Sequence, residues 1–269
     1  MKKLVFLYLL IMHATLLFAD PVSFVKFTFK DSESWGILRE HRIIEIDAAP
    51  WINQRETGRY YSLEEVDLLP PVSPTKVLAI GLNYRSHSGD AGAAKPELFA
   101  KFPSSVQGGG NILIPEDAVN IHYEGELVIV IGRETKDVDV REARESIFGI
   151  TIGNDISERS WQSSDLQWTR AKASDGFAPV GPKLVQGQEW SDLLISTFVN
   201  GELRQNESTA KLIHSPEEIV SWVSRYITLE PGDIIFTGTP GRTQRVSEGD
   251  LIEVKIENIG ILSNRVVWE

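Results

Sequence analysis

Two glutamates stand at the head of an apolar run in the segment His122-Tyr-Glu-Gly-Glu-Leu-Val-Ile-Val-Ile131. The apolar tail is typical of a buried strand, and side chains in a strand return to the same face at every second residue. Glu124 and Glu126 should therefore point the same way. Two neighbouring carboxylates at the mouth of a buried strand repel each other and are costly to desolvate unless a cation neutralises them. The simpler alternative is that both glutamates face solvent at the edge of a sheet.

A second apolar strand ends in polar residues that could complete such a site. The strand is predicted over Ile147–Ile152, and Asn154-Asp-Ile-Ser-Glu-Arg159 follows it as the start of a helix. Asp155 is placed to supply a third oxygen ligand, although a helix cap is its ordinary role. The chain has no cysteine, so disulfides, thiolate nucleophiles and thiolate ligands are excluded. An all-oxygen site favours magnesium, manganese or calcium over softer metals.

The elements that precede this site indicate a small β domain. Three short segments are rich in β-forming residues and separated by polar turns: Phe24–Phe29, Ser34–Leu38 and His41–Glu45. The capping-box pattern Ser62-Leu-Glu-Glu65 then predicts a short helix running toward Leu69. Pro70-Pro-Val-Ser-Pro74 ends that helix, because three prolines in five residues cannot continue it. The sequence therefore predicts a small N-terminal domain over residues 20–71 and a larger domain over residues 72–269.

Strands dominate the larger domain, which makes the chain a β-dominated α+β protein. The clearest strand candidates are Lys76–Ile80, Glu126–Ile131, Ile147–Ile152 and Leu251–Glu257. Hairpin or turn signals stand at Asn200-Gly201, Pro231-Gly232 and Gly249-Asp250. One helix is predicted over Val140–Ser146, and Ser215-Pro-Glu-Glu218 opens another. The apolar stripe of that second helix is predicted to be Ile219, Trp222, Val223 and Tyr226.

Several motifs occur together in a fixed order. They are Gly81-Leu-Asn-Tyr84 with His87, the Tyr-Glu-Gly-Glu strand, Asn154-Asp-Ile-Ser with Arg159 and Gln162, Lys172-Ala-Ser-Asp175, and Pro231-Gly-Asp-Ile-Ile-Phe-Thr-Gly-Thr-Pro240. In this order and spacing they resemble the fumarylacetoacetate hydrolase family over roughly residues 72–269, and several co-ordered motifs are far more specific than one. The resemblance implies a mixed β-roll fold, a homodimer, and Mg²⁺ or Mn²⁺ bound by Glu124, Glu126 and Asp155.

The resemblance also assigns roles to the lid, which we define as the long segment from Gly81 to about Pro103 and expect to be a loop. His87 would be the general base that activates water, and Asp90, three residues later, would orient it. Relatives with this form of lid commonly carry glutamate where Asp90 stands here, and aspartate is one methylene shorter. Without the resemblance, His87 would be an ordinary loop histidine. Three further histidines are interpreted as structural or solvated: His41, His122 and His214.

Cationic and polar side chains would hold the substrate. By the same resemblance, Arg159, Gln162 and Lys172 contact the carboxylate and oxo groups of a small 2-keto acid, Lys172 belongs to the catalytic group, and Thr239 donates a hydroxyl hydrogen bond there. Without the resemblance, Arg159 and Lys172 would read as surface charges and Thr239 as a turn residue. The chain departs from the family at Ser160, where relatives usually carry aspartate, so support for Arg159 is expected to be missing.

The predicted reaction is divalent-metal-dependent hydrolysis of a C–C bond in an acylpyruvate or a similar β-diketo acid. Water deprotonated by His87 would attack the distal carbonyl, and the leaving carbanion would collapse as a metal-stabilised enolate. Two alternatives stay open. Relatives use the same site to isomerise 2-hydroxy-dienedioates or to decarboxylate 2-keto diacids, and a chain with a degenerate lid could bind keto acids without turning them over.

The N-terminus and the charge of the chain suggest where it acts. Lys2 and Lys3 precede an apolar run from Leu4 to Phe18 that ends at Ala19, as in a secretory signal peptide over residues 1–19. Cleavage there would export the enzyme to the periplasm and leave no membrane span, and the cytoplasm is the alternative. A formal net charge of -11 with no visible basic face argues against a nucleic-acid partner.

Overall fold

The structure is a computed structural model that describes residues 20–89 and 91–269. The predicted signal peptide over residues 1–19 and the predicted role of Asp90 therefore lie outside the described residues. Within the described part of the chain, no helix has both the length and the apolar character needed to cross a membrane.

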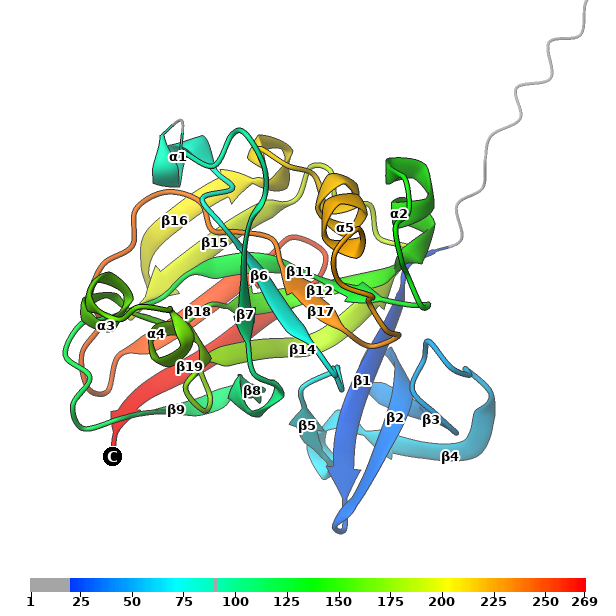
Figure 1. The fold of residues 1–269 in the computed structure, drawn as a ribbon. Coiled ribbons are helices and arrows are strands. Elements are labelled where there is room, and N and C mark those ends of the chain that lie inside the picture. Colours follow the sequence, from blue (N-terminus) through cyan, green and yellow to red (C-terminus); the bar gives the residue numbers. More distant parts are fainter. Residues whose placement is uncertain (1–19, 90) are drawn as a thin grey trace, which may run out of the picture.

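A large mixed sheet forms the centre of the molecule (Figure 1). Its strands, in chain order, are β1 (Val22–Phe29), β2 (Ser32–Arg39), β3 (Arg42–Ile46), β4 (Glu56–Ser62), β5 (Asp67–Leu69), β6 (Val77–Gly81), β7 (Glu97–Lys101), β8 (Val106–Gln107), β11 (Gly125–Ile131), β12 (Ile147–Asn154), β14 (Ala178–Gln186) and β17 (Ile234–Phe236). The main path runs β4-β3-β2-β1-β14-β12-β11-β17-β6-β7, with β5 beside β1 and β8 beside β14. The pairs β17–β6 and β14–β8 are parallel, and the other pairs are antiparallel.

A second sheet packs against the first. It runs β16 (Glu202–Ser208), β15 (Leu194–Val199), β18 (Leu251–Ile256), β19 (Gly260–Trp268) and β9 (Gly110–Ile114), while β10 (Ile121–His122) and β13 (Ser157–Glu158) form a separate pair. Alternate residues of β11 enter two different apolar clusters. Leu127 and Ile129 pack with Ile195 and Val254 of the second sheet, while Val128 lies in the cluster on the opposite face. Burial on both faces accounts for the continuous apolar run at residues 127–131 of β11.

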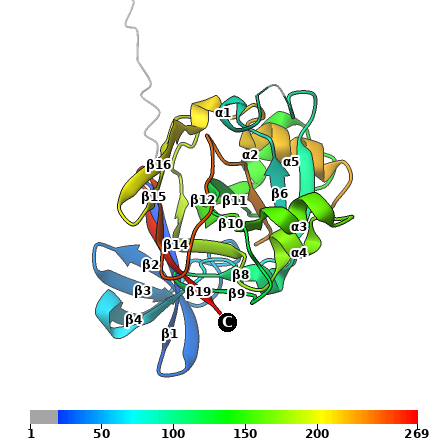
Figure 2. The same cartoon turned by 90° about the vertical axis from the view of Figure 1, so that its left-hand side faces the viewer.

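Short helices lie around the sheets. They are α1 (Arg85–Ser88), α2 (Val140–Ser146), α3 (Arg159–Ser164), α4 (Thr169–Ala173) and α5 (Pro216–Ser224), with 3₁₀ turns η1 (Leu63–Glu65), η2 (Pro103–Ser105) and η3 (Thr209–Lys211). Helices α2 and α5 lie side by side, and α3 and α4 are neighbours at another end of the molecule (Figures 1 and 2). The described part of the chain is thus strand-dominated, which confirms the predicted β-dominated α+β class.

Three local predictions are wrong. The capping box at Ser62 is present, but it opens only one 3₁₀ turn, because residues 67–69 pair with β1 as strand β5 instead of continuing a helix. The lid is not a loop throughout, since it contains α1 and the paired strand β7. Tyr226 does not belong to the buried stripe of the second predicted helix, because it lies beyond the end of α5 and is 66% exposed.

The N-terminal strands extend the central sheet instead of forming a separate one. Strand β1 pairs antiparallel with β14, with Val22 opposite Gln186 and Phe24 opposite Leu184. The sheet is therefore continuous across the boundary predicted at residues 71 and 72. Figure 1 shows β1 to β5, in blue to cyan, extending from one end of the sheet.

Glu45 is a buried acid within these N-terminal strands. Its carboxylate accepts hydrogen bonds from the hydroxyls of Ser34 at 2.9 Å and Thr57 at 2.6 Å, and from the guanidinium of Arg59. Burial raises the pKa of this carboxyl, but the three hydrogen bonds, with that of Arg59 the largest, outweigh burial and hold the pKa below its ordinary value.

We expect Glu45→Gln to lower the free energy of unfolding by about 1.5–3 kcal/mol at pH 7, the range for hydrogen bonds to a charged group. Because the pKa is lower in the folded chain, this stabilisation is present above about pH 4.3 and is lost as the pH falls through the folded pKa. Urea unfolding should therefore show the two proteins converging on acidification. The exposed Glu56→Gln is the control, and equal stability of Glu45→Gln and wild type at pH 7 would contradict the prediction.

Candidate active site

Three buried carboxylates meet where β11 begins and β12 ends. Glu124, Glu126 and Asp155 are 5%, 2% and 1% exposed, and one carboxylate oxygen from each lies within 4.8 Å of the others. The register of the two strands places Gly125 opposite Asn154, and the amide of Asp155 donates to the carbonyl of Glu124 at 2.9 Å. The alternative in which the glutamates face solvent is therefore wrong. The three carboxylates could hold one metal ion.

Asp155 is not the cap of the following helix. The N-cap of α3 is Glu158, whose carboxylate accepts from the amide of Trp161 and also from the amides of Val119 and Asn120. The ordinary role that the sequence offered for Asp155 is thus filled by another residue. The carboxylate of Asp155 instead lies beside the carboxylates of Glu124 and Glu126.

Gly125 separates the two glutamates because no side chain fits there. A Cβ at this position would lie 2.2 Å from the hydroxyl oxygen of Thr197 and 3.0 Å from a methyl carbon of Val254, both on the second sheet. The close approach of that sheet therefore requires glycine at this point. It keeps both glutamates on the opposite face, toward the site.

We expect Gly125→Ala to lower the free energy of unfolding by about 1–3 kcal/mol through overpacking. Thr197→Ala should relieve the closest clash at little cost of its own, because the buried Thr197 hydroxyl has no hydrogen-bond partner among the described residues. In urea unfolding, the double variant should therefore be more stable than the sum of the two single changes predicts. A Gly125→Ala protein within about 0.5 kcal/mol of wild type would contradict this packing argument.

Three cationic side chains surround the carboxylates. The ammonium of Lys172 donates to Glu124 at 2.6 Å and to Asp155 at 2.7 Å. Lys101 donates to Asp155 and to the backbone carbonyl of Lys172, and the guanidinium of Arg159 pairs with Glu124. Lys101 was not predicted from the sequence, because it ends β7 inside the segment expected to be a loop. The available signal was a lysine closing the short apolar run Leu-Phe-Ala.

The charges in the cluster are unevenly compensated. Burial raises the pKa of Glu124, but the charges of Lys172 and then Arg159 outweigh it, so this pKa lies below its ordinary value. Glu126 shows the reverse, because burial, followed by repulsion from Asp155 and Glu124, raises its pKa well above the ordinary value. A divalent cation would supply the compensation that Glu126 lacks. The all-oxygen donor set fits a hard cation such as Mg²⁺ or Mn²⁺.

The imidazole of His87 faces this cluster in a defined tautomer. Its Nδ1 lies 2.6 Å from the carbonyl oxygen of Gly241, and its Nε2 lies 3.9 Å from the carboxylate of Glu124. A carbonyl can only accept, so Nδ1 carries the proton in the neutral ring and Nε2 keeps its lone pair. The ring therefore presents a base to the site. The contact predicted from Asp90 lies outside the described residues, and Gly241 is a partner of Nδ1 that sequence analysis did not find.

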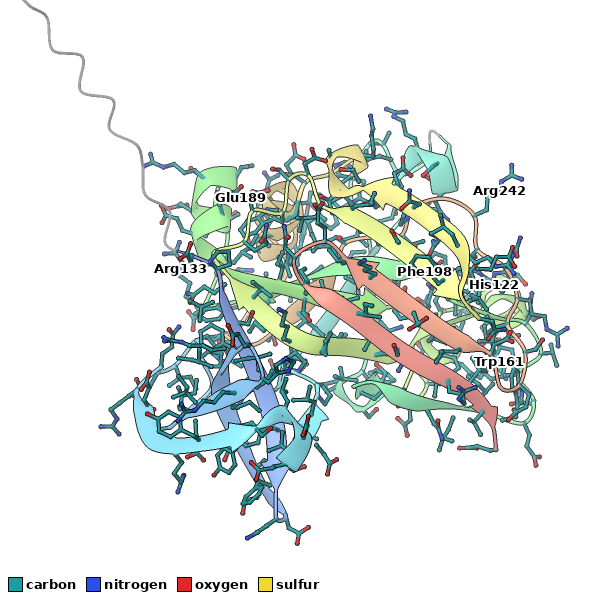
Figure 3. All side chains as sticks on the ribbon, turned by 180° about the vertical axis from the view of Figure 1, so that it is seen from behind. His122, Arg133, Trp161, Glu189, Phe198 and Arg242 are labelled. Carbon is teal, nitrogen blue, oxygen red and sulfur yellow. The ribbon has the colours of Figure 1, made fainter. Side chains whose placement is uncertain are left out.

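Arg159 is supported although Ser160 replaces the aspartate usual in relatives. Its guanidinium donates to the side-chain oxygen of Gln162 at 2.7 Å and to the hydroxyl of Thr243 at 3.0 Å. The Nδ1 of His122 lies 2.9 Å from the same hydroxyl. Thr243 thus provides support for Arg159 that the sequence predicted to be missing. His122 contacts the same hydroxyl of Thr243. Figure 3 shows His122 near Trp161 of α3, at the end of the molecule that carries Arg159.

The hydroxyl of Thr239 is engaged within the protein. It donates to the carbonyl of Gly125 at 3.0 Å and accepts from the side-chain amide of Gln205 at 2.8 Å. The single hydrogen of the Thr239 hydroxyl is therefore already donated within the protein. In this arrangement Thr239 offers the site an oxygen but no hydroxyl donor. The neighbouring amide of Gly238 donates to Glu126 at 2.6 Å. The loop after β17 thus holds the start of β11 at two points.

The predicted site residues line a common cavity. All the site residues predicted from sequence within the described part of the chain line it: His87, Glu124, Glu126, Asp155, Arg159, Gln162, Lys172 and Thr239. Phe99 and Trp168 close one side with ring centroids 5.4 Å apart, and sequence analysis missed both. The cavity therefore combines carboxylates, cations, a base and an apolar wall. These are the groups needed to bind a small anion and move a proton on it.

Comparisons with known proteins agree with this arrangement. Residues 76–267 match the family described as fumarylacetoacetate (FAA) hydrolase C-terminal, and residues 23–71 match Rv2993c-like, N-terminal. The crystal structure of 2-hydroxyhepta-2,4-diene-1,7-dioate isomerase from Mycobacterium marinum is 39% identical, with a TM-score of 0.87 over 92% of this chain and 99% of that chain. The mitochondrial oxaloacetate tautomerase FAHD2B of Bos taurus is 37% identical over 220 residues, 76% of this chain and 70% of that protein. Fumarylpyruvate hydrolase from Pseudomonas aeruginosa, solved with Mn²⁺ and pyruvate, is 32% identical, with a TM-score of 0.68 over 76% of this chain and 92% of that chain.

Proposed function

Because this chain belongs to the fumarylacetoacetate hydrolase family, we propose that it is a divalent-metal-dependent enzyme that transfers a proton on a small 2-keto acid through its enol form. The reaction would be a tautomerisation or a double-bond isomerisation. The observation that carries the proposal is the lone pair on His87 Nε2, which faces the buried carboxylates in a cavity also lined by Lys172 and Arg159.

The metal would be bound by Glu124, Glu126 and Asp155. The three buried carboxylates, which include Glu126 with its raised pKa, form an all-oxygen donor set that supports a hard cation, and the fumarylpyruvate hydrolase that contains Mn²⁺ supports the same class of ion. When bound, such an ion polarises a keto oxygen and favours negative charge on it. Both Mg²⁺ and Mn²⁺ accept these ligands.

The protein's own residues supply the proton transfer. His87 Nε2 would take a proton from the carbon next to the keto group, while its Nδ1–H stays bonded to the carbonyl of Gly241 and keeps the ring in place. The imidazolium formed in this way lies near the carboxylate of Glu124, which stabilises its charge. Return of the proton to the oxygen or to a different carbon would complete a tautomerisation or an isomerisation. Lys172 and Arg159 would hold the carboxylates of the substrate.

Hydrolysis, the reaction preferred from sequence, is the second candidate. The same lone pair on His87 could deprotonate a water molecule, and the similarity to fumarylpyruvate hydrolase favours this reading. We rank it second because the isomerase and the tautomerase are more similar to this chain, at 39% and 37% identity against 32%. Both candidates use the same residues, so only product analysis separates them.

The test is to incubate the purified protein with Mn²⁺ or Mg²⁺ in D₂O with three substrates: oxaloacetate, 2-hydroxyhepta-2,4-diene-1,7-dioate and fumarylpyruvate. We expect chelator-sensitive loss of enol absorbance with deuterium entering carbon, and no pyruvate beyond the amount formed by the ion alone. Pyruvate with the matching acid would place hydrolysis first, and enzyme-dependent release of CO₂ would indicate a decarboxylase. If none of the three is consumed, the enzyme proposal fails and a keto-acid-binding protein remains.

Two further predictions concern the whole protein. We propose a homodimer on the resemblance to the family, and light scattering coupled to gel filtration would test it. Export to the periplasm stays a prediction from residues 1–19, which lie outside the described residues. Fractionation of the producing cells tests it, and full-length protein found in the cytoplasm would contradict it.

A further inference from the structure

We propose that Ser86 and Glu207 are positioning residues, which dock helix α1 onto Gly241 and thereby set the tautomer of His87. The inference rests on the proposed function, because the tautomer matters to turnover only if His87 is the base. It adds two residues that the motifs of the family did not indicate. Neither is among the described residues that line the cavity, so both would act through α1.

The two polar backbone groups of Gly241 contact two neighbouring residues of α1. Its amide donates to the hydroxyl of Ser86 at 2.9 Å, and its carbonyl accepts from His87 Nδ1 at 2.6 Å. The φ angle of Gly241 is +63°, the left-handed region that favours glycine, although a Cβ there would meet no atom within 4 Å. The glycine is therefore explained by backbone conformation. That conformation turns both polar groups toward α1.

Glu207 determines which way the Ser86 hydroxyl bonds. Ser86 donates its single hydrogen to the carboxylate of Glu207, a half-buried residue of β16. With its hydrogen held by a charged acceptor, the hydroxyl keeps a lone pair free for the amide of Gly241, which can only donate. A continuous chain of hydrogen bonds thus runs from a strand of the second sheet to the backbone of Gly241, and from there to the ring of His87.

Helix α1 depends on such outside contacts. It spans only four residues, and a helix this short is unstable on its own. Ser88 ties its end to nearby carbonyls of the lid itself, which holds the turn together but does not fix it to the rest of the protein. The N-cap residue Tyr84 is buried and bridges Leu212, so the start of α1 is anchored. Ser86 and His87 supply the links from α1 itself to Gly241 and the second sheet. Without the link through Ser86, His87 Nδ1 would no longer meet its carbonyl in one fixed geometry.

The test follows the ring of His87 directly, by ¹⁵N NMR of histidine-labelled, metal-free protein. We expect the wild-type ring in the Nδ1–H tautomer. Ser86→Ala and Glu207→Ala should each give a mixture of tautomers at His87, with the exposed His41 unchanged. In the metal-loaded enzyme, kcat should fall about 10-fold, with KM and Mn²⁺ affinity within about 2-fold, as for a residue that acts only on the reacting geometry.

Conservative variants separate positioning from general damage to the fold. Ser86→Thr keeps the hydroxyl and should restore the wild-type spectrum and kcat, and Glu207→Gln keeps an acceptor and should retain most of both. Glu202→Gln, an exposed change on the same strand, is the matched control. A pure Nδ1–H tautomer in both alanine variants would overturn the inference while leaving the proposed function intact. Mixed tautomers in a protein that turns over no keto acid would uphold the docking role and remove the proposed function.

Discussion

Glu126→Gln is expected to abolish saturable Mn²⁺ binding and to lower metal-dependent turnover by at least about 10³-fold, because a bound cation contributes several kcal/mol to the stabilisation of developing charge. The substitution removes one of the three carboxylates that approach within 4.8 Å, at almost unchanged volume. Isothermal titration with Mn²⁺ would measure the affinity. Glu134→Gln, an exposed glutamate just beyond the other end of β11, is the control, and a Glu126→Gln protein that keeps wild-type affinity would contradict the assignment.

The same substitution has an opposite effect on the metal-free protein. Burial and the neighbouring carboxylates raise the pKa of Glu126, so its contribution to stability is present at low pH and is lost as the pH rises through that folded pKa. Glutamine has no such ionisation. We therefore expect the metal-free variant to be at least as stable as wild type at pH 8, while Mn²⁺ raises the melting temperature of wild type alone. A variant that is less stable without metal would show that Glu126 is needed for the fold itself.

His87→Ala is expected to lower kcat by about 10²–10⁴-fold, the usual contribution of a general base, with Mn²⁺ affinity within a few-fold of wild type. The reason is that the ring carries the lone pair facing the site but is not one of the three carboxylates that would hold the ion. The exposed His41→Ala is a control for loss of a histidine. Parallel loss of metal binding in His87→Ala would assign the ring a structural role, and unchanged kcat would remove it from the mechanism.

Local patterns predicted much of the fold. Strand β12 and helix α2 both lie where they were predicted, at residues 147–154 and 140–146. Asn200 and Gly201 form the turn between β15 and β16, both with positive φ, as the dipeptide predicts. Strand β18 buries Ile252 and Val254 on one face, in keeping with its alternation. In each case the deciding signal lies within a few adjacent residues.

Elements that depend on distant partners were not predictable in the same way. Residues 67–69 are partly polar and form a strand only because β1 offers them an edge. Strand β7 likewise exists through its pairing with β6, although its sequence lies within a segment of small residues. These pairings join residues that are far apart in the chain, and no periodicity of the short segments themselves signals them.

The residues of the candidate site show the same difference between local signals and contacts with distant parts of the chain. The carboxylates were predictable because a period of two places Glu124 and Glu126 on one face, and the family motifs indicated the base and two of the three cations, Lys101 being the one that was missed. Gly241 and Thr243 act through a backbone carbonyl and a hydroxyl that reach the site from a loop. Their sequence contains no sign of this, because their roles arise only when the loop after β17 folds over the cavity.

The pairing of β1 with β14 bears on how this protein could be shortened. Strand β14 is bonded on its other side to β12, the strand that leads to Asp155. Deleting the N-terminal strands would leave residues 184–186 of β14 without their partner strand. An exposed edge of this kind recruits strands from other molecules, so a truncated chain should aggregate even where each catalytic residue is retained. The N-terminal strands thus cover an edge of the sheet that carries the site, and we expect them to keep the protein from aggregating.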